Sequence, residues 1–555
     1  MIDPARWRPL TMLLACLVAL VPHGARAQAG NGTDTTRRVD AIFKAWDSPE
    51  SPGCALGVYR DGKIAYSRGY GMADLERRVP ITPRSIFDIG STSKQFTAAA
   101  IVMLAHDGKL TLDDDVRKWI PELPDYGRRI TIRHMLLHTS GIRDYIGLLT
   151  LAGARIDDVT DADDALRIIA RQKALNFEPG AERLYSNSGY FLLSVIVERA
   201  SKQTLQAFAR EKIFKPLGMN STHYLGSYDD IVADRALAYA PRDGGLRLDL
   251  PRWLQVGDGA VFTNVEELLQ WDRNFYEPRV GGVAMIETLQ RPGSLGDGRP
   301  LTYALGLATG THRGQRTISH GGSWGGYRAE LLRFPNQRFS VAILCNLGSI
   351  DASALARRVA DVYLEKMLTG EGAATTAAAD TVALAPEVVQ SYAGMYRNPA
   401  TRERLTFAVS NGALTVSGVK LQPRSKTVFG AEGTAAVFTF EAAGDEHAAR
   451  VTRQQDGRSP EVLEKVQPLK LSADDLAPLA GRFYSEELDA TWTLAVESGV
   501  LMIQRRGAPP QRVVPVVADE FMAGGLTLRV VRVEGRVTGM VLDLGRVRDL
   551  RFARR

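Results

Sequence analysis

A stretch at residues 90–108 that is almost wholly apolar after Lys94 constrains the fold of this chain more than any other feature. It is too short to span a bilayer, so it predicts a helix that is buried on nearly every side. Ser91 stands where an N-cap or first-turn residue belongs, and Gly108 stands where a C′ glycine belongs. The sequence therefore predicts a core helix that begins near Ser91 and ends before Gly108.

Ser91 and Lys94 form a Ser-x-x-Lys pair at the start of this helix. Residues three apart in a first helical turn share one face, which suits a nucleophile and its base. The amine can take the hydroxyl proton only when it is neutral, so it must lie in a dry pocket. The backbone N–H of Ser91 can also point at a developing oxyanion. A helix cap beside a solvated lysine is the alternative, and Ser417-Gly-Val-Lys420 repeats the pattern in a strand-like segment where the two side chains would not meet.

The N-terminus has the pattern of a secretory signal peptide over residues 1–27. Two arginines precede an apolar run at residues 10–21, and residues 25–27 offer a cleavage site of the small-x-small type. A lipoprotein signal ending at Cys16 would be very short, and the apolar run is too short for a stable membrane span. We expect an exported protein, either periplasmic or secreted.

The composition is that of an ordinary soluble protein with two to four domains, because 45% of its 555 residues are hydrophobic and 24% are charged. The charges are scattered, without the basic runs that indicate nucleic-acid binding. No Cys-x-x-Cys or His-Glu-x-x-His motif supports a metal site, and no cofactor is predicted. Cys54 and Cys345 could pair in an oxidising compartment, but two buried free thiols are the favoured interpretation.

Strand patterns bracket a long helical segment in the first part of the chain. Residues 54–59 and 63–70 flank Asp61-Gly62, which is a strong hairpin signal. Residues 110–275 are mostly helical in pattern. Three further strands are predicted at residues 317–322, 327–334 and 338–344. Strands at both ends with helices between them predict a sheet that the two ends of the domain complete.

A segment of small residues at 369–383 is typical of a linker, and an internal repeat follows it. Residues 384–468 and 469–555 are the two copies, which match at a constant offset of 87 residues. Both copies continue as short alternating strands separated by turn residues, so they predict two small antiparallel β-barrels. The matched positions include Leu384, Gly394, Tyr396 and Phe407 in the first copy and Leu471, Gly481, Phe483 and Leu494 in the second.

Tyr185 and Asn187 are candidates for the second part of a Ser–Lys site. The motif Tyr185-Ser-Asn187 lies in a predicted loop just before a helix predicted at residues 189–200. A tyrosine oxygen can relay the serine proton to the leaving group. An asparagine amide can bind both a lysine and a substrate carbonyl.

His320, Gly321 and Gly322 end one of the predicted strands and are candidates for the third part. The two glycines would let a substrate lie against the edge of that strand. The N–H of Ser323 could then complete the oxyanion hole.

Together these residues resemble the serine β-lactamase and penicillin-binding-protein superfamily, on its class C side. The resemblance covers about residues 35–365, and its motifs are Ser91-Thr-Ser-Lys94, Leu137-His-Thr-Ser-Gly141, Tyr185-Ser-Asn187, Pro216-Leu-Gly-Met219, Gly257-Asp-Gly259 and His320-Gly-Gly322. It implies an α/β (α+β) β-lactamase-like catalytic domain at residues 28–368, with an antiparallel sheet and a helical subdomain, followed by the two barrels.

The resemblance also implies roles for the site residues. Ser91 would be the acylated nucleophile, Lys94 its base partner, and Tyr185 the second general acid and base. Asn187 would bind substrate. His320 stands where β-lactamases carry the lysine of Lys-Thr-Gly, and losing that cation argues against efficient β-lactam hydrolysis and against a dedicated transpeptidase.

The D-aminopeptidases of this superfamily are the most similar group, and they also carry two C-terminal barrels. The similar segments are Ser93-Lys-Gln-Phe-Thr97, Gly141-Ile-Arg-Asp-Tyr145 and Gly481-Arg-Phe-Tyr-Ser-Glu-Glu-Leu-Asp489. We therefore expect an exported serine hydrolase with a Ser-Lys-Tyr acyl-enzyme mechanism, of the D-aminopeptidase or D-Ala-D-Ala carboxypeptidase type.

Other functions fit parts of the sequence. One is a related esterase with weak β-lactam hydrolysis, and another is a ligand-binding protein that uses the barrels beside a vestigial site. Gly321-Gly-Ser-Trp-Gly325 also spells the nucleophile elbow of α/β-hydrolases, but a strand pattern follows it where that elbow needs a helix. The sequence leaves open which bond of a peptide, ester or β-lactam-like substrate is cut, whether a barrel gates the site, and the oligomeric state.

Overall fold

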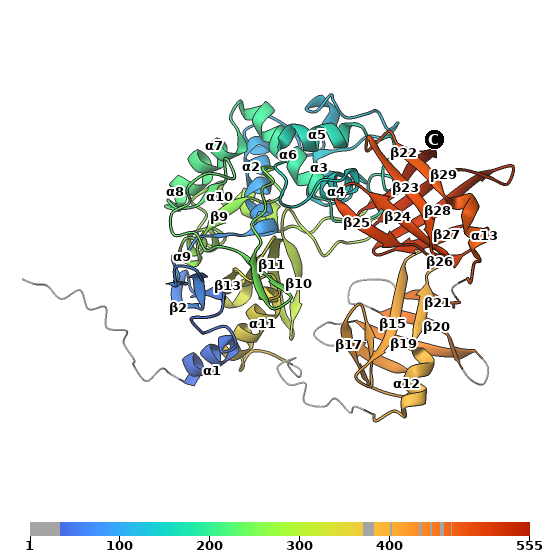
Figure 1. The fold of residues 1–555 in the computed structure, drawn as a ribbon. Helices are drawn as coiled ribbons and strands as arrows, with labels where there is room; N and C mark the ends of the chain where they lie inside the picture. The colour runs from blue at the N-terminus through green and yellow to red at the C-terminus, as the bar shows by residue number, and fades with distance from the viewer. Residues whose placement is uncertain are drawn as a thin grey trace, which may run out of the picture.

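The computed structural model describes residues 34–369, 382–399, 402–431, 436–443, 447–454, 460–467 and 469–555. The predicted signal peptide at 1–27 and most of the predicted linker at 369–383 lie outside these ranges. Among the described residues, no helix combines the length and the apolar character needed to cross a membrane. The chain forms an N-terminal domain of sheet and helices, followed by two C-terminal β-structures (Figure 1).

A six-stranded antiparallel sheet with the order β10-β11-β12-β13-β1-β2 runs through the N-terminal domain. The hairpin predicted around Asp61-Gly62 is confirmed, and its first strand pairs with the last strand of the domain. Both ends of the domain therefore complete one sheet, as predicted, although the sequence pattern did not reveal the edge strand β10. The strands are β1 (Cys54–Arg60), β2 (Lys63–Tyr70), β10 (Ala308–His312), β11 (Gln315–Trp324), β12 (Tyr327–Phe334) and β13 (Phe339–Cys345).

Helices cover both faces of this sheet. α1 (Asp34–Phe43) and α11 (Ala352–Tyr363) pack on one face, and α9 (Val265–Asn274) packs on the other. The other helices of the domain are α2 (Lys94–His106), α3 (Ile132–Leu136), α4 (Tyr145–Ala152), α5 (Ala162–Ala170), α6 (Asn187–Ser201), α7 (Leu205–Ala209), α8 (Lys215–Leu217) and α10 (Gly282–Gln290).

Short strands also lie before and within the segment predicted as mostly helical at residues 110–275. A three-stranded sheet has the order β5-β9-β6, and β3-β4 and β7-β8 are separate pairs. Their bounds are β3 (Met72–Asp74), β4 (Val79–Pro80), β5 (Phe87–Asp88), β6 (His223–Tyr224), β7 (Tyr239–Arg242), β8 (Gly245–Leu248) and β9 (Val261–Thr263).

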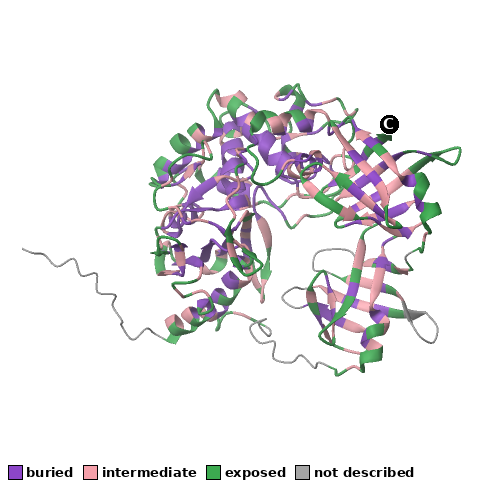
Figure 2. Ribbon diagram, viewed as in Figure 1, coloured by how far each residue is buried: buried purple, intermediate pink, exposed green. Residues whose placement is uncertain are grey.

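The predicted core helix is α2, and it lies inside the helical part of the domain. Nearly all of its side chains are buried, and α6 and α10 pack beside it (Figure 2). Gly108 has a φ of +68° and follows the C-cap residue, which is the predicted C′ position. Ser91 lies in a preceding turn of 3-10 helix, η1 (Gly90–Ser93), so the α-helix begins later than predicted.

Two glycines set the distance between η1 and strand β11. Gly90 has a φ of +49°, and a Cβ there would lie 2.8 Å from the backbone nitrogen of Ser323. A Cβ on Gly322 would lie 1.9 Å from the carbonyl oxygen of Ile89. Both positions therefore require glycine, and the backbone of η1 packs directly on the backbone of β11.

Asp88, the last residue of β5, holds η1 from the other side. Its Oδ1 accepts a hydrogen bond of 2.8 Å from the Gly90 N–H. Burial raises the pKa of the Asp88 carboxyl to about 7, although the Gly90 bond and the charge of Arg235 oppose the rise. The native state therefore keeps a proton that the unfolded chain releases near pH 4.

Cys54 and Cys345 form a disulfide, so the prediction of two free thiols is wrong. The two cysteines stand directly opposite each other in the antiparallel pair of β1 and β13. Their separation of 291 residues in the chain hid this pairing from the local sequence pattern. The disulfide joins the two ends of the N-terminal domain within its sheet.

The two repeats form two β-structures, as predicted. Strands β14–β21 make a closed antiparallel barrel, and β22–β30 make a nine-stranded antiparallel sheet, which we call the second barrel. Matching elements keep the 87-residue offset, since α12 (Pro386–Tyr392) corresponds to α13 (Ala473–Leu476) and β14 (Gly394–Arg397) corresponds to β22 (Gly481–Ser485).

The other strands of the first barrel are β15 (Arg404–Ser410), β16 (Ala413–Val416), β17 (Val419–Pro423), β18 (Val428–Ala431), β19 (Val437–Ala443), β20 (His447–Gln454) and β21 (Glu461–Val466). Those of the second are β23 (Ala490–Glu497), β24 (Val500–Arg505), β25 (Ala508–Arg512), β26 (Val514–Val517), β27 (Glu520–Ala523), β28 (Leu526–Val533), β29 (Arg536–Leu544) and β30 (Val547–Arg554). In the first barrel, the rings of Tyr396, Phe407 and Phe440 pack on one another, so its described interior is a hydrophobic core.

The second barrel docks on the N-terminal domain beside α4 and α5 (Figure 1). The fully buried guanidinium of Arg143 donates to the Glu487 carboxylate at 2.6 Å. It also donates to the backbone carbonyls of Arg548 and Asp549 at 2.9 and 3.0 Å. The loop that carries Arg143 is therefore held in place by the second barrel.

Replacing Glu487 by alanine is expected to destabilise the docked chain by about 3–5 kcal/mol, because it leaves the Arg143 charge buried and unpaired. Denaturant unfolding of the full-length protein measures this change. The neighbouring Lys173–Glu486 pair, whose side chains are 62% and 69% exposed, supplies the control. Glu486→Ala should change stability much less, because water screens an exposed ion pair, and equal losses in both variants would contradict a special role for the buried pair.

Replacing Asp88 by asparagine should stabilise the protein at neutral pH. The native pKa of Asp88 lies above its unfolded value, so its contribution to stability is fully present below about pH 4 and is lost as pH rises to about 7. The asparagine keeps the acceptor for Gly90 and carries no charge. The difference in unfolding free energy between variant and wild type should therefore grow by up to ~4 kcal/mol over this window. A difference that stays constant with pH would refute the proton-binding account.

Candidate active site

Lys94 lies beneath Ser91, with its amine fully buried among three oxygen atoms. Its Nζ is 3.1 Å from Ser91 Oγ, 2.9 Å from Asn187 Oδ1 and 2.5 Å from the carbonyl oxygen of Asp258. A neutral amine can donate its two N–H groups to the two carbonyl-type oxygens and direct its lone pair at the Ser91 hydroxyl. This is the geometry that a Ser–Lys pair needs for proton transfer.

Asn187 is held by the start of its own helix. It is the first residue of α6, two residues earlier than the predicted helix start, and its N–H donates to Asp144 Oδ2 at 2.7 Å. The same carboxylate caps α4 through the Gly147 N–H. Asp144 therefore ties two helices together next to the amide that contacts Lys94.

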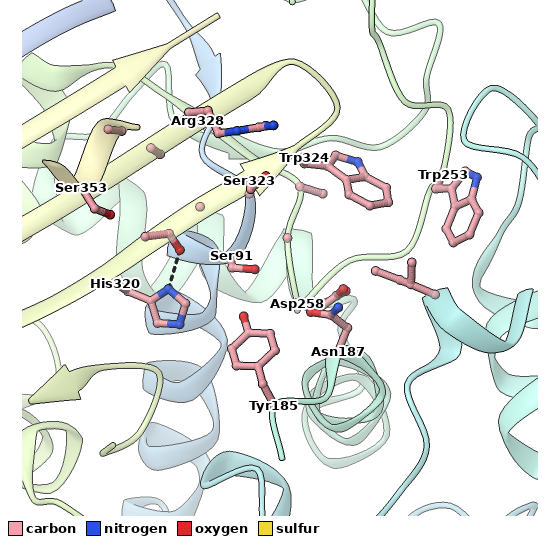
Figure 3. Close-up of a pocket in the computed structure, with 18 of the residues that line it drawn as sticks. Ser91, Tyr185, Asn187, Trp253, Asp258, His320, Ser323, Trp324, Arg328 and Ser353 are labelled. Carbon is pink, nitrogen blue, oxygen red and sulfur yellow. Dashed lines mark hydrogen bonds between the residues drawn. The ribbon is translucent and has the colours of Figure 1, made fainter. Parts of the chain in front are cut away.

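Tyr185 lies on the other side of Ser91, and its phenol points toward the serine (Figure 3). The Lys94 amine lies 4.9 Å from the centroid of its ring. Its hydroxyl is buried and has no hydrogen-bond partner among the residues that the structure describes. The hydroxyl is thus available to a group bound over Ser91.

His320 belongs to a hydrogen-bonded chain that holds it neutral. His138 Nδ1 accepts from the Ser186 N–H at 3.2 Å, so its proton lies on Nε2, which donates to the Tyr303 oxygen at 3.2 Å. The Tyr303 hydroxyl can then donate to His320 Nε2 at 3.0 Å, while His320 Nδ1 donates to the Gly321 carbonyl at 2.7 Å. Burial lowers the pKa of His320 to about 3, and it lowers that of His138 well below its ordinary value. His320 therefore adds no positive charge to the site.

A cavity of about 730 Å³ opens over Ser91. The candidate residues from all three segments line it, except Lys94, which lies below its floor. They are Ser91, Tyr185, Asn187, His320, Gly321, Gly322 and Ser323. The backbone nitrogens of Ser91 and Ser323 belong to η1 and β11, which the two glycine contacts bring together. The structure thus places nucleophile, base and oxyanion candidates around one space.

The nucleophile-elbow sequence and the second Ser-x-x-Lys sequence do not lie in structures that would make them active sites. Ser323 lies inside β11 and is followed by β12, so Gly321 to Gly325 do not form the strand-to-helix elbow of an α/β-hydrolase. Ser417 lies in the turn between β16 and β17, before Lys420 on the next strand. Among the described residues, no group of three or more His, Cys, Asp or Glu side chains could hold a metal ion.

Five further residues belong to this site, although no role is predicted for them from the sequence. His138, Tyr145 and Asp258 lie in motifs that carry only the family resemblance. Burial raises the pKa of Asp258 to about 6, and the Tyr145 hydroxyl donates to its Oδ2 at 3.1 Å. Tyr303 and Arg546 carried no local signal, because only tertiary packing brings them to the cavity or its wall.

Known proteins are similar in sequence to this chain over half of its length or more. The chain matches the Beta-lactamase family over residues 39–364. It is 26% identical to a D-aminopeptidase of Cereibacter sphaeroides (strain KD131 / KCTC 12085) over 548 residues, which covers 94% of this chain and 100% of that protein. It is also 31% identical to penicillin-binding protein 4* of Bacillus subtilis (strain 168) over 302 residues, which covers 51% of this chain and 66% of that protein.

Solved structures share the fold. The octameric penicillin-binding protein homologue from Pyrococcus abyssi matches with a TM-score of 0.57 and 22% identity, covering 78% of this chain and 100% of that one. The D-amino acid amidase from Ochrobactrum anthropi SV3, complexed with L-phenylalanine amide, matches with a TM-score of 0.52 and 20% identity, covering 60% and 99%. The predicted β-lactamase-like fold is thereby confirmed. Because the family match spans more than half of the sequence, the chain belongs to the Beta-lactamase family and is a serine hydrolase.

Proposed function

We propose that this hydrolase cleaves amide bonds of short peptides, as an enzyme of the D-aminopeptidase or D-Ala-D-Ala carboxypeptidase type, through an acyl-enzyme on Ser91. The observation that carries the proposal is the buried Lys94 amine, 3.1 Å from Ser91 Oγ, with two other oxygens to accept its N–H groups. An amine in this position can take the proton of a serine hydroxyl as the oxygen attacks a carbonyl carbon.

The remaining steps use groups that line the same cavity. The oxyanion of the tetrahedral intermediate is held by the N–H groups of Ser91 and Ser323. The C–N bond then breaks as the proton taken from Ser91 passes from Lys94 by way of Tyr185 to the departing nitrogen. Water attacks the ester carbonyl, and Lys94 or Tyr185 passes a proton of this water to the Ser91 oxygen as the ester bond breaks. The acid and the free Ser91 hydroxyl result.

Two observations favour a peptide or amide substrate over a β-lactam. The chain is similar over nearly its whole length to a D-aminopeptidase. In addition, His320 is neutral at the position of the Lys-Thr-Gly lysine, so β11 offers no cation there to a β-lactam carboxylate. The names of these relatives support D-configured residues next to the cleaved bond in the substrate.

The protein is proposed to act after export, in the periplasm or outside the cell. The signal-peptide pattern of residues 1–27 supports this location. The Cys54–Cys345 disulfide supports it too, since stable disulfides belong to oxidising compartments.

Ser91→Ala is expected to lower kcat/KM by at least about 10³-fold, because it removes the nucleophile and leaves only binding and the oxyanion donors. It should also abolish labelling by a serine-directed fluorophosphonate probe. Ser417→Ala, in the second Ser-x-x-Lys sequence, is the matched control and should keep both activity and labelling. Labelling that survives in Ser91→Ala would rule out Ser91 as the nucleophile.

Three chromogenic substrates separate the candidate reactions of the wild-type enzyme. D-alanine p-nitroanilide should be hydrolysed with a higher kcat/KM than nitrocefin, because the chain is similar over nearly its whole length to a D-aminopeptidase. The third substrate, p-nitrophenyl acetate, measures esterase activity that does not depend on substrate recognition. A preference for nitrocefin would contradict the peptidase proposal, and a preference for the ester alone would favour the esterase alternative.

A further inference from the structure

The second barrel contributes one side chain to the cavity over Ser91. Arg546 lies in the turn between β29 and β30, more than four hundred residues after Ser91, and it lines the same cavity. Its guanidinium carbon lies 4.7 Å from the centroid of the Tyr185 ring. A cation from another domain therefore covers the residue proposed to protonate the leaving group.

The backbone of this turn is fixed to the N-terminal domain. The Arg546 carbonyl accepts from Asn176 Nδ2 at 2.9 Å and from the Asp144 N–H at 3.3 Å. Asn176 Oδ1 also accepts from the Arg548 N–H at 2.8 Å. The Arg143 bonds to Arg548 and Asp549 hold the following residues. The position of Arg546 over the cavity is thus set by backbone contacts, which a change of its side chain leaves intact.

The guanidinium keeps its N–H donors free of hydrogen bonds within the described part of the chain. It forms one long ion pair, with Asp144 Oδ2 at 3.8 Å. That oxygen already accepts the Asn187 N–H at 2.7 Å, and Asp144 Oδ1 accepts the Gly147 N–H. The Arg546 side chain is 46% exposed, so water and solutes reach its donors. A guanidinium with free N–H donors beside a reaction centre is suited to binding a carboxylate through two hydrogen bonds.

The other charged groups of the cavity do not offer the same contact. Arg328 lies on β12, and its guanidinium donates to the carbonyls of Gly325 and Tyr327. His320 is neutral. The stacking on Tyr185 places Arg546 on the side from which the leaving amine departs, because Tyr185 is the proposed proton donor to that amine.

We propose that Arg546 binds a carboxylate carried by the leaving group of the substrate, so that this enzyme favours peptides from which it releases an amino acid with a free C-terminus. This inference rests on the proposed function and narrows its substrate class. The second barrel would then supply the cation that β11 lacks at His320. Substrates with a neutral leaving group, such as the C-terminal amide of the same peptide, would not make this contact.

The test compares D-alanyl-D-alanine with its C-terminal amide, which differs only in the carboxylate. In the mature full-length enzyme, Arg546→Met should lower kcat/KM for the acid by about 10- to 100-fold, the value of one charge-assisted contact. Hydrolysis of the amide should stay within about threefold, since methionine still covers the Tyr185 ring. Arg548→Met is the matched control: it removes a neighbouring cation that pairs with Glu182 instead, and should leave the ratio of the two substrates unchanged.

Two outcomes of the kinetic test would overturn the proposal. An unchanged acid-to-amide ratio in Arg546→Met would show that no carboxylate is bound there. An equal loss for both substrates would assign Arg546 to positioning Tyr185 instead.

Binding in the Ser91→Ala background separates this inference from the proposed reaction. Calorimetry should show tighter binding of the acid than of the amide, a difference that is lost in the Ser91→Ala/Arg546→Met double variant and reduced by high KCl. If the wild type cleaves neither peptide while this Arg546-dependent difference remains, the peptidase proposal fails and the carboxylate site stands. If the difference is absent from the Ser91→Ala protein, the carboxylate site fails.

Discussion

The close approach of two backbones, η1 and β11, decides what the N-terminal domain can do. A Cβ at Gly322 would overlap the Ile89 carbonyl, and one at Gly90 would press on the Ser323 nitrogen. Any side chain at either position would push the turn away from the strand. Two oxyanion donors must reach one oxygen atom at about 2.7–3.1 Å, so even a small separation of Ser91 from Ser323 would break up the pair. The left-handed φ of Gly90 follows from the same requirement.

Burial at this contact also controls which side chains can carry charge. Lys94 is fully buried, and its surroundings offer two carbonyl-type oxygen atoms to the N–H groups of its amine. Burial is the largest cause that lowers the pKa of His320 and of His138, so both rings are neutral. A further charge beside the buried amine would be costly in this dry site. The neutral chain from His138 through Tyr303 to His320 is therefore the arrangement that such a buried amine tolerates.

Local patterns were enough to predict α2, the β1–β2 hairpin and the two barrels, because each rests on periodicity, a turn signal or a repeat. They also named the three segments whose residues line the cavity. The features that these patterns do not predict depend on residues that are far apart in the chain. Cys54 and Cys345 meet only through the register of β1 against β13. Tyr303 lies in a loop without a motif, and Arg546 reaches the site only because the second barrel docks there. The sequence around Tyr303 and Arg546 does not differ from the sequence around an ordinary surface tyrosine or arginine.

The docking of the second barrel makes it part of the scaffold of the site. Arg143 is bonded to the barrel, and the next residue, Asp144, holds the N–H of Asn187 and the start of α4. Asn187 in turn accepts from Lys94. A short series of contacts thus connects Glu487 with the amine beside Ser91. An N-terminal domain without the barrel would expose the Arg143 guanidinium and free the loop that places Asn187. The barrel therefore supports the geometry of the site, in addition to the contacts that it makes itself.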